Sequence, residues 1–206
     1  MSTFVCGLDL GQASDPSALV IVEKRADRGR DVRHVVRFPL GTSYPTIVQD
    51  VHTLLNQPPL RANVTLVIDA TGVGRPVCDL FTLQRGRQYG IVQVVITAGN
   101  AVTFEAGFYH VPKRDLVAAV QVPLQNKQLR FPEAAKLPAV NALTHELGNF
   151  RATISAAGHD TYAAWRERDH DDLVLSLALA LWQAQRGQPN ARPIGADERP
   201  GWRPLT

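Results

Sequence analysis

The sequence predicts an α/β fold with a central mixed sheet, antiparallel over its first three strands and parallel thereafter, flanked by helices. Two observations carry this prediction. Three short apolar segments open the chain and are joined by turns, as expected of an antiparallel meander. Helical and strand-like segments then alternate over residues 45–97, which is typical of right-handed crossovers between parallel strands.

The opening strands are expected at residues 4–10, 17–23 and 32–38. The first is a short apolar run that contains Gly7 and Asp9, and it is typical of a buried strand. The third alternates apolar and polar residues with period two. Between the second and third strands, the charged stretch from Lys24 to Asp31 is expected to form a hairpin loop.

Further along the chain, helices are expected at 45–57, 76–83, 113–121, 137–147 and 171–186. Strands are expected at 64–68 and 91–97, with a short edge strand at 128–131 and strands or a hairpin at 150–154 and 162–165. The last helix is apolar nearly all round, which predicts that it is largely buried, and Gly187 is placed to end it.

The composition fits one globular domain. The chain has 206 residues, of which 45% are hydrophobic and 20% charged, and no apolar stretch approaches a membrane span. No signal-peptide pattern opens the sequence. Cys6 and Cys78 are expected to be reduced, buried thiols, and no C-x-x-C pair suggests zinc. Residues 1–187 are expected to form the domain, and residues 188–206, with four prolines, a loosely held tail.

The net charge of +3 permits an anionic partner without requiring one. The basic residues cluster in two places, an early hairpin and the start of a later helix. If the partner is DNA, the candidate phosphate contacts are Lys24, Arg25, Arg28, Arg30, Arg33, Lys113 and Arg114. A solvated basic face explains the same clustering equally well.

Four acidic residues lie within or next to apolar segments that are predicted to be buried. Asp9 belongs to the first strand, Asp69 ends a buried strand, and Asp171 and Asp172 open the last helix. Asp69 lies at the carboxyl end of a parallel strand, where open α/β sheets form their sites. Convergence of these acids would favour a divalent cation, and ligands that are all oxygen favour Mg²⁺ or Mn²⁺. The structural alternative is an Asx-turn at Asp9 and Asp69 and a helix cap at the Asp171–Asp172 pair.

The motifs around these acids resemble those of one family. The segment Gly7-Leu8-Asp9-Leu10-Gly11 through Val20 resembles the opening strand and hairpin of the nuclease domain of phage terminase large subunits. Val67-Ile68-Asp69-Ala70-Thr71-Gly72 is similar to that family's second acidic motif, and His170-Asp171-Asp172-Leu173-Val174 to its third. Pro112 to Val117 resembles the connecting helix. The resemblance spans roughly residues 4–185.

This resemblance implies an RNase H-like nuclease domain that cuts concatemeric viral DNA during genome packaging with two Mg²⁺ or Mn²⁺ ions. By motif position, Asp9, Asp69 and Asp172 would be catalytic metal ligands, with Asp171 as a secondary ligand or helix cap and Asp15 as an additional acid. His170 would contact the scissile phosphate or lie on the surface. Implied partners are double-stranded DNA and an ATPase motor domain, portal or small terminase subunit, all in the cytoplasm of the host cell.

One departure from the family pattern concerns the motor. A terminase large subunit carries an ATPase before its nuclease, yet this sequence has no G-x-x-x-x-G-K-[ST] phosphate loop. We therefore expect either a nuclease domain separated from its motor or a free-standing relative. ATP-driven translocation cannot reside in these residues.

Three other functions fit parts of the same sequence. A Holliday-junction resolvase uses the same fold and acids but prefers branched DNA. An actin-like or sugar-kinase ATPase would use Gly7–Gly11 and Asp69–Gly72 as phosphate loops, but that fold needs more than 206 residues. A DNA-binding or assembly module without catalysis would leave the acids as caps and turns.

Overall fold

The computed structural model describes residues 3–11, 15–72, 74–84, 86–134, 137–149 and 171–186. The strands are β1 Thr3–Asp9, β2 Ala18–Lys24, β3 Arg30–Arg37, β4 Val64–Asp69, β5 Gly90–Thr97, β6 Thr103–Glu105, β7 Phe108–Pro112 and β8 Leu129–Arg130. The helices are α1 Tyr44–Leu55, α2 Gly74–Thr82, α3 Lys113–Gln125, α4 Val140–Asn149 and α5 Asp172–Arg186.

All eight described strands form one sheet in the order β6-β7-β5-β4-β1-β2-β3-β8. The pairs β1–β2 and β2–β3 are antiparallel, which confirms the predicted opening meander. On the other side of β1, strands β4, β5 and β7 follow in parallel. Strands β1, β3, β4, β5 and β7 therefore end at one edge of the sheet, here called the carboxyl edge. The β2–β3 turn lies at the opposite edge.

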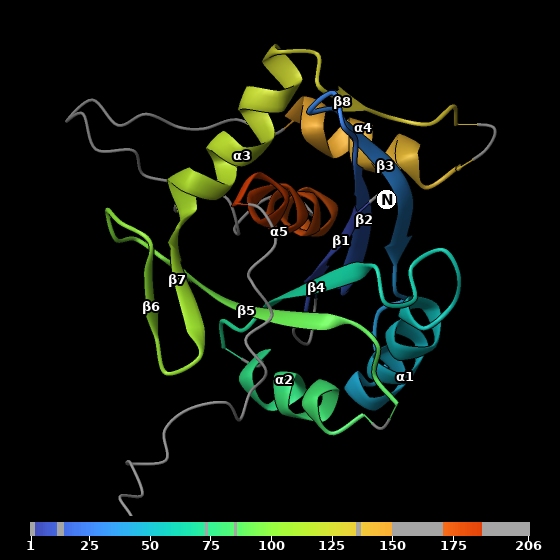
Figure 1. Ribbon diagram of the computed structural model, residues 1–206, viewed down its shortest axis with the longest axis vertical. Helices are drawn as coiled ribbons and strands as arrows, with labels where there is room; N and C mark the ends of the chain where they lie inside the picture. Colours follow the sequence, from blue (N-terminus) through green and yellow to red (C-terminus); the bar gives the residue numbers. More distant parts are fainter. Residues whose placement is uncertain are drawn as a thin grey trace, which may run out of the picture.

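Helices cover both faces of the sheet, giving three layers (Figure 1). One core cluster joins the sheet to α3, α4 and α5, and the other joins it to α1 and α2. Side chains alternate between the two clusters along each central strand, so that Val5 faces α5 whereas Cys6 and Leu8 face α1 and α2. This double coverage is the reason that the central strands are apolar on both faces.

Helix α5 lies directly against β1 and β2, and every residue from Asp172 to Ala184 is buried, as its apolar sequence predicts. The close approach depends on Gly7. A Cβ atom at this position would overlap the carbonyl oxygen of Ser176 and lie 2.9 Å from the amide nitrogen of Ala180. Glycine in the middle of β1 therefore sets how near the last helix comes to the sheet.

Two elements differ from their predicted limits for local reasons. Helix α4 begins at Val140 rather than at Leu137, because Pro138 disfavours helical geometry in the residue before it. Helix α3 extends past residue 121 to Gln125, with Pro123 inside its last turn. The short edge strand is confirmed as β8, which pairs in parallel with β3.

The β6–β7 hairpin is absent from the sequence prediction. Strand β6 has three exposed residues, too few for an alternating pattern to be visible. The sequence feature that could have indicated this hairpin is Gly107 in the turn between the strands. In the structure, Ala106 and Gly107 have φ angles of 50° and 88° there. A glycine flanked by Phe104 and Phe108 is typical of such a hairpin.

Both cysteines are buried and free of a disulfide, which confirms their prediction as reduced structural thiols. Burial raises the pKa of the Cys6 thiol, and burial, with smaller contributions from Asp79 and Asp69, raises that of Cys78 to about 12. No helix among the described residues is long and apolar enough to cross a membrane. The strands predicted at 150–154 and 162–165, the Gly187 cap and the tail at 188–206 lie outside the described residues.

Candidate active site

Two of the predicted acids end neighbouring strands. Asp9 is the last residue of β1 and Asp69 the last of β4. The two strands are parallel, and Leu8 is paired with Ile68. Asp9 and Asp69, the next residue of each strand, therefore lie side by side at the carboxyl edge. Adjacent strands lie about 4.8 Å apart, and the two residues are therefore direct neighbours across the ladder.

Both side chains project from the face that α5 covers. Along β1, Val5 and Gly7 face α5, and alternation places Asp9 on that side. Along β4, Val67 belongs to the same core cluster, so Asp69 also faces α5. Asp9 and Asp69 are only 8% and 3% exposed, which is unusual for carboxylates and requires compensating contacts.

The third acid reaches this edge from α5. Asp172 is the first residue of the helix and is 6% exposed. One turn later, the hydroxyl of Ser176 contacts the carbonyl oxygens of Asp172 and Ala18 at 2.8 and 2.9 Å. Ala18 is the cross-strand partner of Asp9. Ser176 thus ties the start of α5 to the strand beside Asp9 and brings the third acid to the same edge.

The loop after β4 fixes the orientation of Asp69. Its Oδ1 accepts the backbone N–H of Thr71 at 2.8 Å, so the Asx-turn that the sequence offered as an alternative is present. The Thr71 hydroxyl in turn accepts the N–H of Ile96 at 3.0 Å, which ties the turn to β5. Gly74 opens α2 directly against this loop, where a Cβ would overlap the carbonyl oxygen of Asp69. A turn role and a ligand role are compatible, because a carboxylate has two oxygens.

Two residues that the sequence did not single out as site residues adjoin Asp172. Arg37, at the end of β3, donates from Nη2 to Oε1 of Glu146 in α4, and its Nε lies 3.7 Å from Oδ2 of Asp172. The other oxygen of Glu146 accepts the backbone N–H groups of Leu173 and Val174 at 3.2 and 3.4 Å. Glu146 therefore caps the first turn of α5 from a different helix.

The remaining acidic candidates are less enclosed. Asp171 is half-buried and precedes α5, where its carbonyl oxygen accepts the N–H of Leu175 at 2.9 Å, as expected of an N-cap residue. Asp15 is exposed in the β1–β2 connection, at the carboxyl edge. The burial of Asp172 favours it over Asp171 as the principal site residue. His170 lies outside the described residues.

The donor chemistry fits a hard divalent cation. Three buried carboxylates face one edge from β1, β4 and α5, and none of the described cysteines lies among them. In the described part of the chain, no three His, Cys, Asp or Glu side chains lie close enough together to hold a metal ion. The acids therefore match a divalent cation by their position and chemistry and do not form a complete coordination site. Asp9, Asp69 and Asp172 are therefore candidate ligands by their position at the carboxyl edge and by their oxygen chemistry alone.

One of the two predicted basic groups lies at this edge. Lys113 and Arg114 begin α3 immediately after β7, whose carboxyl end extends beyond Asp69 because Pro112 pairs with Thr97. Arg114 donates to the side-chain and carbonyl oxygens of Asn100, in the loop between β5 and β6. These contacts hold an exposed cation at the carboxyl edge, beyond the end of β7 and two strands away from Asp69.

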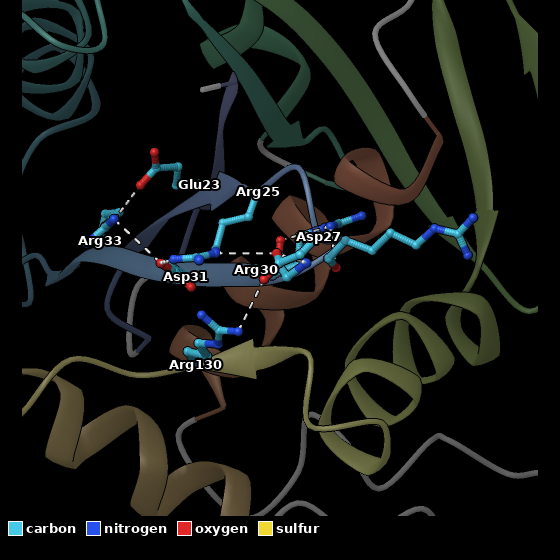
Figure 2. A network of polar contacts seen from close by, with 9 residues as sticks. Glu23, Arg25, Asp27, Arg30, Asp31, Arg33 and Arg130 are labelled. Carbon is cyan, nitrogen blue, oxygen red and sulfur yellow. Dashed lines mark hydrogen bonds and ion pairs between the residues drawn. The ribbon is translucent and has the colours of Figure 1, made fainter. Parts of the chain in front are cut away.

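The other basic group lies far from the acids. Lys24 pairs with Thr3 and Ala18 with Asp9, so the β2–β3 hairpin is separated from Asp9 by the length of β1. That length is about 20 Å at roughly 3.4 Å per residue. Within the hairpin, Arg25 pairs with Asp27 and Asp31, Arg33 with Glu23 and Asp31, and Arg130 of β8 with Asp27 (Figure 2).

Several hairpin cations thus have structural partners. Arg30 donates from Nη2 to the carbonyl oxygen of Ala184, in the last turn of α5, where a cation offsets the negative end of the helix dipole. Burial and the nearby charge of Arg30 lower the pKa of Lys24. Arg28, in contrast, occupies the tip of the hairpin with φ 63° and is exposed. The contribution of this hairpin to DNA binding remains a prediction.

A hollow lies at the same opposite edge, on the face covered by α1. Phe4, Ile21 and Leu60 contribute to its apolar floor, and His34, whose pKa burial lowers, lies in its wall. None of the three buried acids lines it. The carboxyl edge is therefore the better candidate for the site, because it combines chemistry-bearing side chains with the convergence of several elements.

Comparison with known proteins gives fold-level likenesses. No family model and no curated protein sequence matches the chain. Among solved structures, the large terminase nuclease from thermophilic phage G20c aligns with a TM-score of 0.59 and 21% identity, covering 88% of this chain and 82% of that one. The large terminase nuclease domain of bacteriophage SPP1, solved with bound Mn, gives 0.55 and 12%, covering 86% and 84%.

The chain has a terminase nuclease-like fold. The large terminase of bacteriophage HK97 aligns with a TM-score of 0.55 and 17% identity. The alignment covers 88% of this chain but only 39% of that longer chain. The terminase nuclease-like fold confirms the RNase H-like class predicted from the sequence, with its antiparallel start and parallel continuation. At these identities the likeness concerns the fold.

Proposed function

We propose that this chain is an endodeoxyribonuclease that hydrolyses phosphodiesters with Mg²⁺ or Mn²⁺. The observation that carries the proposal is the placement of Asp9, Asp69 and Asp172, three buried carboxylates that face one edge of a terminase nuclease-like sheet. The Mn bound by the SPP1 nuclease domain supports the choice of cation.

Asp9, Asp69 and Asp172 would hold the cations. Asp9, between β2 and β4 in the sheet, is the candidate to bridge two of them. When bound, a pair of divalent ions supplies an activated water and stabilises the charge on the leaving 3′-oxygen. The protein's own contribution is to position the carboxylates, through the Asx-turn at Asp69 and the anchored start of α5.

Lys113 and Arg114 would hold the DNA backbone beside these acids. Their place at the start of α3 brings positive charge to the edge where phosphates must approach. Such contacts position a duplex without reading its sequence. The hairpin cations at the opposite edge remain a second group that could contact DNA farther from the site of cleavage.

The biological role we propose is the cutting of concatemeric viral DNA during genome packaging. The similarity to three phage large terminases supports this context. Packaging would require an ATPase motor and contacts with a portal or a small terminase subunit. The cytoplasm of the infected cell is where such a complex would work.

Plasmid cleavage at low salt tests the enzymatic proposal. Supercoiled plasmid is incubated with the protein and Mn²⁺, Mg²⁺, Ca²⁺ or EDTA, with Asp9→Asn as the inactive variant and Asp50→Asn, an exposed acid on α1, as the matched control. We expect nicking and linearisation with Mn²⁺ or Mg²⁺, retained by Asp50→Asn and lost with EDTA or Asp9→Asn. Equal behaviour of Asp9→Asn and the unmodified protein would contradict the proposal.

A further inference from the structure

Arg37 lies between two shielded carboxylates. The side chains of Glu146 and Asp172 are 10% and 8% exposed, and the guanidinium of Arg37 is paired to both. Its two contacts differ in kind. The Nη2 group donates a hydrogen bond to Glu146, whereas Nε lies 3.7 Å from the Asp172 oxygen, beyond hydrogen-bond distance.

Glu146 is held in place independently of Arg37. One of its oxygens accepts the backbone N–H groups of Leu173 and Val174, at the positive end of the α5 dipole. The carboxylate is therefore fixed relative to Asp172, the first residue of the same helix. Arg37 is thereby bonded to a fixed acceptor and kept slightly apart from Asp172.

We propose that Arg37 and Glu146 are positioning residues that set the affinity of Asp172 for a divalent cation, an inference that rests on the proposed nuclease function. Arg37 supplies positive charge to Asp172 before a cation arrives. Glu146 retains the guanidinium, so that Arg37 stays 3.7 Å from Oδ2 of Asp172 rather than closing to hydrogen-bond distance.

Opposite signs are expected from the two substitutions. Arg37→Gln removes a competing positive charge and should tighten Mn²⁺ binding. Glu146→Gln keeps an oxygen that can accept the N–H groups of α5 but loses its charge, so Arg37 turns to Asp172 and Mn²⁺ binding should weaken. A role limited to packing predicts that both substitutions weaken binding, because both would disorganise the start of α5.

The test is calorimetric titration of the whole protein with Mn²⁺, without DNA. We expect Arg37→Gln to lower the Kd about fivefold or more and Glu146→Gln to raise it by a similar factor, as is typical of coupling between linked sites. Arg37→Lys, which keeps the charge, should stay near the unmodified value. The matched control is Arg33→Gln, on the same strand but paired with Glu23 and Asp31 at the opposite edge.

Thermal unfolding in EDTA supplies a second readout. Arg37→Gln should lower the melting temperature while tightening Mn²⁺ binding, since two buried carboxylates lose their shared cation. Shifts of Kd in the same direction for Arg37→Gln and Glu146→Gln, or an equal shift for Arg33→Gln, would overturn the inference. Absence of Mn²⁺ binding by the unmodified protein overturns both the inference and the proposed function, whereas Mn²⁺ binding without DNA cleavage overturns the proposed function alone.

Discussion

Asp9 and Asp69 end two adjacent parallel strands at the same level, and both face α5. The hydrogen-bonded ladder fixes their backbone separation at about 5 Å, so the two buried carboxyl groups start from neighbouring positions on one face of the sheet. Like charges held this closely repel, and a cation between them relieves the repulsion. If both carboxylates are ionised, bound positive charge would therefore be favourable at the carboxyl edge.

Asp69→Asn should separate catalysis from stability. The amide oxygen can still accept the Thr71 N–H that forms the Asx-turn, while the negative charge is lost. We expect cleavage to fall about a hundredfold or more, because bound metal contributes several kcal/mol to the transition state. The melting temperature in EDTA should stay the same or rise as repulsion with Asp9 is removed. A parallel loss of activity and stability would indicate a structural role instead.

Charge reversal should distinguish the two basic groups. Lys113→Glu with Arg114→Glu should weaken binding to duplex DNA and reduce the slope of log affinity against log salt by about 2, since each neutralised phosphate adds roughly 0.9. Arg28→Glu, at the exposed tip of the hairpin about 20 Å away, should have a smaller effect on cleavage. Fluorescence anisotropy over a range of salt concentrations measures the affinity and its salt slope, and plasmid cleavage measures the effect of Arg28→Glu. An unchanged slope for the double variant would exclude Lys113 and Arg114 from the DNA contact.

Gly7→Ala should destabilise the protein by about 3 kcal/mol, because a Cβ at this position overlaps the Ser176 carbonyl and forces α5 away from β1. Urea unfolding measures the loss. The matched control is Gly90→Ala in β5, where a Cβ would lie 3.8 Å from the nearest side-chain atom and should be tolerated. Equal stability of the two variants would contradict the close packing of α5 on the sheet.

The buried thiols predict resistance to modification and a loss of stability in alkali. The pKa of Cys78 rises from 9.0 to about 12 on folding, and that of Tyr89 from 10.0 to about 12, both chiefly through burial. A raised pKa contributes stability below the unfolded value and loses it as pH rises towards the folded one. We therefore expect the free energy of unfolding to decline between about pH 9 and 12.

Thiol reactivity at pH 8 checks the same feature. Cys6 and Cys78 should react with a thiol reagent only after unfolding, because both are fully enclosed and protonated in the folded chain. Rapid reaction of either thiol in the native protein would contradict its burial.

Local patterns in the sequence were enough to predict most elements. Apolar periodicity located the central strands and the buried last helix, and the acids stood out because they interrupt or adjoin apolar runs. The β6–β7 hairpin was missed because Phe104 is the one apolar residue in a three-residue exposed strand. Such a strand owes its existence to its neighbour rather than to its own composition.

The contacts that complete the candidate site were beyond local patterns. Arg37 and Glu146 are 109 residues apart in sequence, and nothing near either residue marks it as a partner of the other. The neighbouring positions of Asp9 and Asp69 depend on which strands pair, a choice made by the whole sheet. Predicting the acids was possible because each has a local signature, whereas their shared register and the cap supplied by Glu146 arise only on folding.

The hydrogen bond between Ser176 and Ala18 joins residues 158 positions apart, so it can form only late in the synthesis of the chain. A ribosome releases Asp9 and Asp69 long before it releases α5, and β1 and β2 lack their apolar cover until that helix emerges. The acidic edge can therefore assemble only when translation has passed residue 186. A growing chain therefore lacks Asp172, the third acid of the candidate site, during most of its synthesis.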